Sequence, residues 1–152
     1  MDSILTNPDD CGAITVAVVD RRPDDYADLR RATRGADIRW EFASNGQQAL
    51  RLARTQPVDV WMVNDFLPDM SGLEVCALLK NFLVQAVIYV VTDNYDQAIE
   101  REARICGAAL FECKPFKPDL ISQLALQNRK HINGRRTLNL QTRARPPTKT
   151  KA

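Results

Sequence analysis

Five short strand-like runs, each followed by a segment with helical periodicity, constrain the fold of this 152-residue chain more than any other feature. Most of the runs are rich in β-branched residues and too short for buried helices, which is typical of strands in a parallel sheet. The expected strands span residues 14–19, 38–43, 58–63, 86–91 and 108–112. The expected helices span residues 24–35, 47–54, the stretch after Gly72, 96–105 and a last segment that begins at Pro118. This alternation predicts an α/β fold with a five-stranded parallel sheet, right-handed crossovers and helices on both faces.

The distribution of charge divides the chain into three parts. Residues 1–12 form an N-terminal extension, residues 13–127 one domain, and residues 128–152 an arginine-rich C-terminal tail that we expect to be flexible. The tail holds eight basic residues and no acidic one, whereas residues 1–127 hold 13 basic and 19 acidic groups, a net charge of −6. An acidic body with a cationic tail predicts that the tail attracts an anionic partner.

The remaining composition argues against several function classes. No stretch approaches the roughly 18 consecutive apolar residues of a membrane span, and no signal peptide is recognisable, so we expect a cytoplasmic protein. The four cysteines share no C-x-x-C spacing, and the single histidine, His131, lies in the tail. We therefore expect no metal site, no cofactor and no catalysis that depends on a histidine base.

Polar residues follow the expected strands at the places where open α/β sheets bind ligands, beyond the carboxyl ends of the strands. The first strand ends in Asp20 and Arg21, the third in Asn64 and the fourth in Thr92, and Lys114 follows the fifth. Because parallel strands end at the same edge of a sheet, we expect these side chains to lie near one another. Together they form the candidate site.

With these residues in this order, residues 14–127 resemble the receiver domain of bacterial two-component response regulators, a CheY-like member of the flavodoxin-like folds. The family pattern is a strand that ends in two acids, a phosphorylated aspartate four residues before a proline, a Thr or Ser, and a Lys-Pro pair. Asp20, Thr92 and Lys114 match this pattern. Phe111, three residues before the lysine, matches the family's aromatic switch position.

Two positions depart from the family pattern. Arg21 replaces the second acid, and Asn64, four residues before Pro68, replaces the phosphorylated aspartate. The family's reaction needs a carboxylate nucleophile and a magnesium ion held by oxygen ligands, and an amide beside a guanidinium supplies neither. We expect Arg21 to pair with Asp20, and Asp65 to point away from the site because successive strand residues point to opposite sides. The chain is therefore interpreted as a degenerate pseudo-receiver and not as an enzyme.

The matching residues also have structural interpretations, which we favour over a working switch. Thr92 fits a cap for the turn after the fourth strand, Lys114 fits an ion pair with Asp20, and Phe111 fits a packed residue. The face formed by residues 96–127 is the family's usual surface for a protein partner. That role needs no phosphorylation.

The tail differs from a plain block of lysines because its arginines are interleaved with leucines and amides. Arginine presents a planar fork to O6 and N7 of guanine and also stacks on the face of the base, so a cyclic dinucleotide with two guanines and two phosphates suits this composition. The tail is similar to that of stand-alone, chemotaxis-type receiver proteins that bind cyclic di-GMP through an arginine-rich stretch and act on the flagellar motor. The candidate ligand-binding residues are Arg129, Arg135, Arg136, Asn139, Gln141, Arg143 and Arg145.

Two alternatives to cyclic di-GMP binding stay open. The first is a plain interaction module with an inert tail and a constitutive protein partner. The second is nucleic-acid binding by the tail, which we disfavour because the tail has no aromatic residue for base stacking and no helix-turn-helix follows the domain. The favoured hypothesis is a phosphorylation-independent signalling protein that binds cyclic di-GMP and regulates a protein partner such as the flagellar motor.

Overall fold

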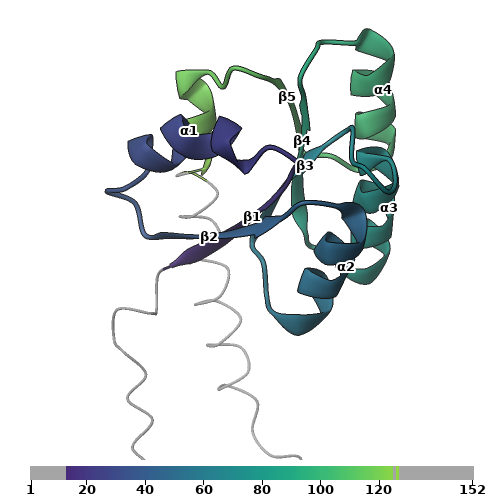
Figure 1. The fold of residues 1–152 in the computed structure, drawn as a ribbon, viewed down its shortest axis with the longest axis horizontal. Helices are drawn as coiled ribbons and strands as arrows, with labels where there is room; N and C mark the ends of the chain where they lie inside the picture. The colour runs from purple at the N-terminus through teal and green to yellow at the C-terminus, as the bar shows by residue number, and fades with distance from the viewer. Residues whose placement is uncertain (1–12, 125, 127–152) are drawn as a thin grey trace, which may run out of the picture.

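The computed structural model describes residues 13–124 and 126, which form a five-stranded parallel sheet between two layers of helices (Figure 1). The order of the strands in the sheet is β2-β1-β3-β4-β5. The strands are β1 (Ile14–Val19), β2 (Ile38–Ala43), β3 (Val60–Asn64), β4 (Val87–Thr92) and β5 (Leu110–Cys113). The predicted fold is confirmed, and β1 and β2 have the predicted bounds. The other three strands begin one or two residues later than predicted.

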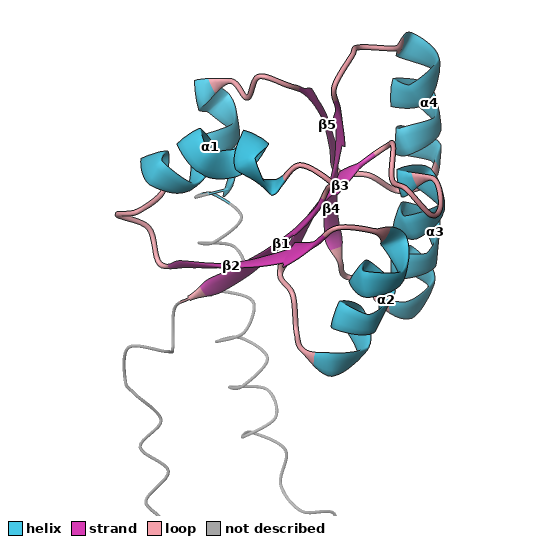
Figure 2. Ribbon diagram, in the orientation of Figure 1, coloured by secondary structure: helices cyan, strands magenta, loops and turns pink. Residues whose placement is uncertain are grey.

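The helices lie on both faces of the sheet (Figure 2). They are a 3-10 helix (Pro23–Tyr26), α1 (Ala27–Ala32), α2 (Gly46–Thr55), α3 (Gly72–Phe82), α4 (Gln97–Ile105) and a helical segment over residues 118–124. The 3-10 helix, α1 and residues 118–124 cover one face, and α2, α3 and α4 cover the other. The side chains of Asn45, Ser71 and Asp96 accept hydrogen bonds from the first turns of α2, α3 and α4, which explains where these helices begin.

The first helical segment is shorter than the predicted span of residues 24–35. It starts as a 3-10 helix, and α1 ends three residues before Gly35. The buried hydroxyl of Thr33 lies 3.0 Å from the main-chain oxygen of Leu29 and 3.1 Å from that of Arg30. This hydroxyl competes for the carbonyl groups of the last turn, and the helix ends there.

Side chains of the central strands alternate between two apolar clusters, one on each face of the sheet. Trp61 of β3 and Ile88 of β4 belong to the cluster under α2, α3 and α4. Met62 and Tyr89, the next residues along the same strands, belong to the cluster under α1 and residues 118–124. Burial of each such side chain contributes about 1.5–3 kcal/mol, so the sheet is a firm support for the residues at its carboxyl end.

The loop between β3 and α3 is closed by direct backbone contacts. The amide of Gly72 donates to the main-chain oxygen of Asp65 at 2.9 Å, and Phe66 and Ser71 form an isolated antiparallel bridge. A Cβ atom at position 72 would lie 1.8 Å from the main-chain oxygen of Asn64, so only glycine fits there. The start of α3 is thereby held against the end of β3.

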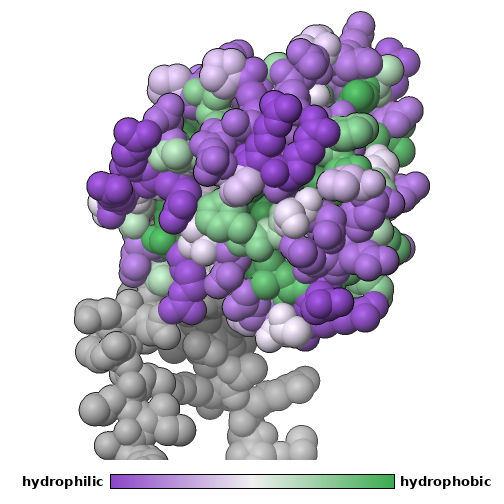
Figure 3. Space-filling model, viewed as in Figure 1, coloured by the Kyte–Doolittle hydropathy of each residue, from purple (hydrophilic) through white to green (hydrophobic). Residues whose placement is uncertain are grey.

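The surface is mostly hydrophilic. Figure 3 shows smaller hydrophobic areas between the hydrophilic side chains in the middle of one face. Phe42, Phe66, Tyr95 and Ile105 are among the large hydrophobic residues that reach the surface. In the described part of the chain, no helix combines the length and the hydropathy that a membrane crossing requires.

Candidate functional site

The structure brings four of the predicted site residues to one edge of the sheet. Asp20 directly follows β1, Asn64 and Thr92 are the last residues of β3 and β4, and Lys114 directly follows β5. Asp20, Asn64 and Thr92 are only 1–2% exposed. Buried polar side chains need partners inside the protein, and the contacts of these residues define the site.

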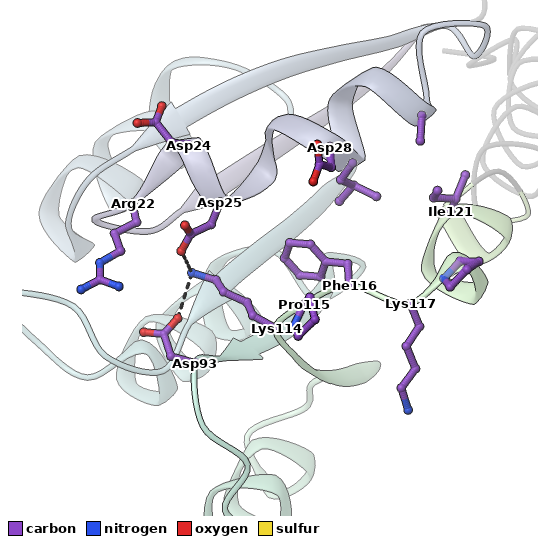
Figure 4. A pocket seen from close by; sticks show the side chains of 13 residues that line it. Arg22, Asp24, Asp25, Asp28, Asp93, Lys114, Pro115, Phe116, Lys117 and Ile121 are labelled. Atoms are coloured by element: carbon purple, nitrogen blue, oxygen red, sulfur yellow. Dashed lines mark hydrogen bonds and ion pairs between the residues drawn. The ribbon is translucent and has the colours of Figure 1, made fainter.

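Lys114 is bound to three carboxylates. Its Nζ lies 2.8 Å from Oδ2 of Asp20, 2.7 Å from Oδ2 of Asp25 and 2.9 Å from Oδ1 of Asp93. Figure 4 shows the ammonium group between Asp25 and Asp93. The ion pair with Asp20 was predicted, whereas the sequence did not single out Asp25 and Asp93 as partners. Asp25 comes from the 3-10 helix and Asp93 follows β4, so Lys114 joins three separate segments of the chain.

Both carboxylate oxygens of Asp20 accept hydrogen bonds from other donors as well. Oδ2 accepts from the hydroxyl of Tyr26 at 2.9 Å and from Nδ2 of Asn64 at 3.0 Å, and Oδ1 accepts from the main-chain N–H of Arg22 at 2.9 Å. A buried carboxylate surrounded by donors is stabilised in its charged form. Six residues are joined by these contacts and together are named the Lys114 cluster: Asp20, Asp25, Tyr26, Asn64, Asp93 and Lys114.

The Asn64 side chain is oriented at both ends of its amide. Nδ2 donates to Asp20 and, at 3.4 Å, to Oδ1 of Asp93, while Oδ1 accepts from the main-chain N–H of Phe66 at 2.9 Å. The amide therefore acts as a neutral bridge between two carboxylates and the loop after β3. A carboxylate at this position would place a negative oxygen where the NH₂ group now donates.

Burial and charge pairing shift pKa values in the cluster. Burial alone would lower the pKa of Lys114, but its hydrogen bonds to the three carboxylates hold that pKa well above the ordinary 10.5. Burial would raise the pKa of Asp93, yet the hydrogen bond and the charge of Lys114 lower it. The pKa of Tyr26 is raised well above 10.0, first by burial and then by the charge of Asp20. Lys114 therefore stays charged and Tyr26 neutral at physiological pH.

Arg21 does not pair with Asp20, so this expectation was wrong. Its guanidinium nitrogen lies 4.0 Å from Oδ2 of Asp93, and its Cζ atom lies 4.6 Å from the centre of the Phe66 ring. Donors from inside the fold already bind the oxygens of Asp20. Arg21 therefore lies on the exposed side of the cluster, where it stacks on an aromatic ring.

Asp65 was expected to point away from the site, but its half-buried carboxyl contacts the hydroxyl of Thr92. β3 ends at Asn64, so the alternation of strand side chains no longer sets the direction of the next residue. Burial raises the pKa of Asp65, and the contact with Thr92 partly opposes that rise. Asp65 thus lies at the edge of the site, while the ammonium of Lys114 binds the other carboxylates.

Thr92 and Phe111 make contacts that are typical of structural residues. The hydroxyl of Thr92 donates to the main-chain oxygen of Asn94 at 2.8 Å, which closes the turn after β4. Phe111 is half-buried against the core cluster under α4, and its ring lies edge-on to that of Tyr95 with 6.2 Å between the ring centres. A switching role for Phe111 stays a prediction.

The residues predicted to bind a ligand in the tail lie outside the described residues. They are Arg129, Arg135, Arg136, Asn139, Gln141, Arg143 and Arg145. Their role stays a prediction.

A groove of about 710 Å³ lies beside the Lys114 cluster, between α1 with its preceding 3-10 helix and residues 114–121. Charged residues such as Asp24 and Lys117 line it together with apolar residues such as Phe116 and Ile121 (Figure 4). Across residues 13–124, no group of three or more His, Cys, Asp or Glu side chains is arranged to hold a metal ion. The site is thus an ion-pair network whose carboxylates are bound by the protein's own donors.

Comparison with known proteins supports a regulatory family. The model of the response regulator receiver domain matches residues 16–126, which include the whole Lys114 cluster. The transcriptional regulatory protein KdpE of Mycobacterium tuberculosis is 35% identical over 104 residues, which cover 68% of this chain and 46% of that protein. The chain therefore matches less than half the length of this curated relative.

Solved structures agree on the fold. A CheY-like response regulator receiver domain protein from Methanospirillum hungatei superposes with a TM-score of 0.70 at 17% identity, over 78% of this chain and 95% of that chain. A response regulator from Thermotoga maritima gives 0.69 at 20% identity, over 77% of this chain and 98% of that chain. With the sheet order, the residues at the strand ends and the family match in agreement, the chain belongs to the response regulator receiver domain family.

Proposed function

We propose that this receiver-family protein signals through protein contacts without accepting a phosphoryl group. The observation that carries the proposal is the ammonium of Lys114 bound to three carboxylates, with the amide of Asn64 bound to Asp20. The resemblance to the family places the phosphorylated aspartate at the position of Asn64. A side-chain amide shares its nitrogen lone pair with the carbonyl group, so it lacks the nucleophilic oxygen anion that phosphoryl transfer requires.

The residues of the cluster do not fit a magnesium ion either. Magnesium needs several oxygen ligands in a regular arrangement, and Oδ2 of Asp20 and Oδ1 of Asp93 already accept from Lys114 and Asn64. The guanidinium of Arg21 adds a second positive charge 4.0 Å from Asp93. A divalent cation would have to displace an ammonium group and lie beside a guanidinium, which Coulomb repulsion opposes.

Intact-mass spectrometry after incubation with acetyl phosphate and magnesium tests this proposal. We expect no added phosphate on the wild-type chain. We also expect none on Asn64→Asp, because Arg21 still opposes the cation. The double variant Arg21→Asp/Asn64→Asp restores both acids of the family pattern and is expected to gain a magnesium-dependent phosphate. Asn94→Asp adds a negative charge at an exposed position nearby and is the matched control. A phosphate on the wild-type chain contradicts the proposal.

We further propose that cyclic di-GMP binds the tail and supplies the input that the body lacks. The charge asymmetry supports this proposal, because residues 128–152 carry eight basic groups and no acidic group. Two phosphates need cationic partners, and each guanine accepts a bidentate arginine at O6 and N7. The main contacts are assigned to Arg135, Arg136, Arg143 and Arg145, which act together because ordering the tail costs conformational entropy.

Calorimetric titration of the full chain with cyclic di-GMP, GTP and a short DNA duplex tests the ligand. Arg136→Ala and Arg143→Ala are each expected to weaken cyclic di-GMP binding by about 1–3 kcal/mol. Lysine at either position should be nearly as harmful, because it keeps the charge but loses the fork. Lys149→Ala, which removes a charge but no guanidinium, is the matched control.

Three outcomes would redirect the assignment. Full affinity with lysine in place of these arginines, or binding of the DNA duplex as tight as that of cyclic di-GMP, favours nucleic-acid binding by the tail. A chain that ends at Gln127 and binds the dinucleotide as tightly as the full chain places the site outside the tail. No binding at all leaves the plain interaction module as the better description.

The proposed output is a protein contact on the face formed by residues 96–127, with the flagellar motor as the partner that the resemblance suggests. Ile105 at the end of α4 is 78% exposed and offers an apolar contact on this face. Ile105→Glu is expected to weaken partner binding without changing the fold, as measured by affinity and by circular dichroism. Partner binding that does not respond to cyclic di-GMP favours the constitutive module.

A further inference from the structure

The strand β2 forms one outer edge of the sheet, and its free side has a defined set of backbone groups. Within the described residues β2 pairs only with β1. The main-chain oxygens of Asp37 and Ala43 accept from β1 and from Asp20, so the odd-numbered residues turn their backbone groups toward β1. A parallel ladder alternates with a period of two, so Trp40 and Phe42 turn their N–H and C=O groups outward.

The side chains of β2 also alternate in a regular way. Ile38, Trp40 and Phe42 lie on the face that α1 covers, where Phe42 is 38% exposed and carries the guanidinium of Arg30 at 5.0 Å from its ring centre. Arg39 and Glu41 lie on the opposite face and carry opposite charges. The edge therefore reads apolar, basic, apolar, acidic, apolar, which is symmetric about Trp40 except for the sign of the charge.

We propose that the β2 edges of two copies of this chain pair antiparallel about a two-fold axis at Trp40. In this register Trp40 lies opposite Trp40 of the partner subunit, and Ile38 lies opposite Phe42 of the partner subunit. Arg39 lies opposite Glu41 of the partner subunit, and the same pair repeats across the axis. The outward backbone groups of Trp40 are paired with their equivalents, so both sheets continue through the interface as one.

The charges select this register over its neighbours. A shift that places Arg39 at the axis brings two arginines opposite each other, and a shift that places Glu41 at the axis brings two glutamates together. Like charges directly opposite each other in a sheet are destabilising, so both slipped pairings are disfavoured. Charged residues usually protect an edge strand against association. Here their alternation in sign protects against other strands and slipped registers but fits a second copy.

Sedimentation velocity of the full chain from micromolar to millimolar concentration tests this inference. We expect a concentration-dependent dimer. Arg39→Glu and Glu41→Arg should each weaken the dimer by about tenfold, because each turns two attractive pairs into two repulsive ones. The double variant Arg39→Glu/Glu41→Arg restores the complementarity with the charges exchanged, and it should dimerise as the wild type does.

Two further variants guard against indirect effects. Arg51→Glu makes the same change of charge at an exposed position on α2 and should leave the dimer intact. Phe42→Lys adds a positive charge at the edge itself and should weaken the dimer while circular dichroism stays unchanged. A chain that is monomeric at millimolar concentration, a dimer that neither single reversal weakens, or a double variant that fails to recover overturns the inference. The test is independent of phosphorylation and of cyclic di-GMP.

Discussion

The carboxyl end of the sheet and the outer face of α4 contain ion pairs of almost equal length in very different surroundings. Lys114 lies 2.8 Å from Asp20, and Arg104 lies 2.7 Å from Glu100. The side chains of Lys114 and Asp20 are 11% and 1% exposed, whereas those of Arg104 and Glu100 are 72% and 24% exposed. Water competes for the exposed charges and hardly reaches the buried ones. The contribution of a pair is therefore set by its burial rather than by its length.

The two regions also differ in how their members depend on one another. Loss of Arg104 leaves a glutamate that water solvates. Loss of Lys114 leaves Asp20 buried beside two further carboxylates, without the cation that balances them. Breaking a buried pair costs far more than the pair itself contributes, because the remaining charge stays desolvated. The Lys114 cluster is thus a fixed part of the fold, and the pair on α4 is dispensable.

The largest effect is expected from Lys114→Met. The substitution keeps much of the side-chain volume and removes the charge, and it should lower the free energy of unfolding by about 3 kcal/mol. Urea unfolding followed by circular dichroism measures the change. The double variant Asp20→Asn/Lys114→Met removes the stranded charge as well and should recover more than half of the loss. A single variant as stable as the wild type would show that the cluster contributes nothing.

A smaller effect is expected from Tyr26→Phe, which removes the hydroxyl that donates to Asp20 at 2.9 Å. The aromatic contact with Phe116 is kept, so the loss should be about 1–2 kcal/mol in the same urea assay. Tyr89→Phe is the matched control, because the buried Tyr89 hydroxyl has no hydrogen-bond partner among the residues that the structure describes. That control should leave the stability unchanged or slightly raised. Equal losses in both variants would assign the effect to packing.

Alkaline pH probes the buried region without any substitution. In the folded protein the pKa of Lys114 lies above 10.5 and that of Tyr26 well above 10.0. Above pH 10 the unfolded chain releases these protons while the folded chain keeps them, so the free energy of unfolding falls as the pH rises. Urea midpoints at neutral pH and at steps above pH 10 measure this fall. Tyr26→Phe should make the decline shallower, and a parallel decline in both proteins would contradict the assignment to Tyr26.

The smallest effect is expected from Arg104→Ala on α4. The pair with Glu100 is exposed, and water replaces the lost partner, so the urea midpoint should not move measurably from that of the wild type. Arg104→Lys serves as the control that keeps the charge. A loss comparable to that of Lys114→Met would show that burial is not what separates the two regions.

The sheet could be predicted from the sequence because its strands have local signals. β1 is a short β-branched run, and β2 alternates apolar and charged residues, and both have the predicted bounds. The pair of Lys114 and Asp20 could be predicted because both residues follow strand ends that parallel pairing brings together. The contact of Lys114 with Asp25 could not, because it joins positions 89 residues apart and depends on where the 3-10 helix lies over the sheet.

The wrong expectations for Arg21 and Asp65 have a common cause. Each residue follows the end of a strand, where the ladder no longer fixes the direction of a side chain. Beyond that point the turn and the competition for partners decide. Three donors from the interior bind Oδ2 of Asp20, and Arg21 is left to stack on Phe66. No local pattern in the sequence records such a competition.

The close approach of Gly72 to the end of β3 limits the mutational routes by which this chain can acquire a carboxylate in the cluster. A slip of the β3–α3 loop by one residue would bring Asp65 into the place of Asn64. The backbone of Gly72 lies against Asn64 so closely that a Cβ atom would be 1.8 Å from its oxygen, and this contact holds the loop in register. Insertion or deletion in the loop therefore cannot exchange the two residues without separating α3 from the sheet. A carboxylate beside Asp20 is reached only by substitution at position 64 itself.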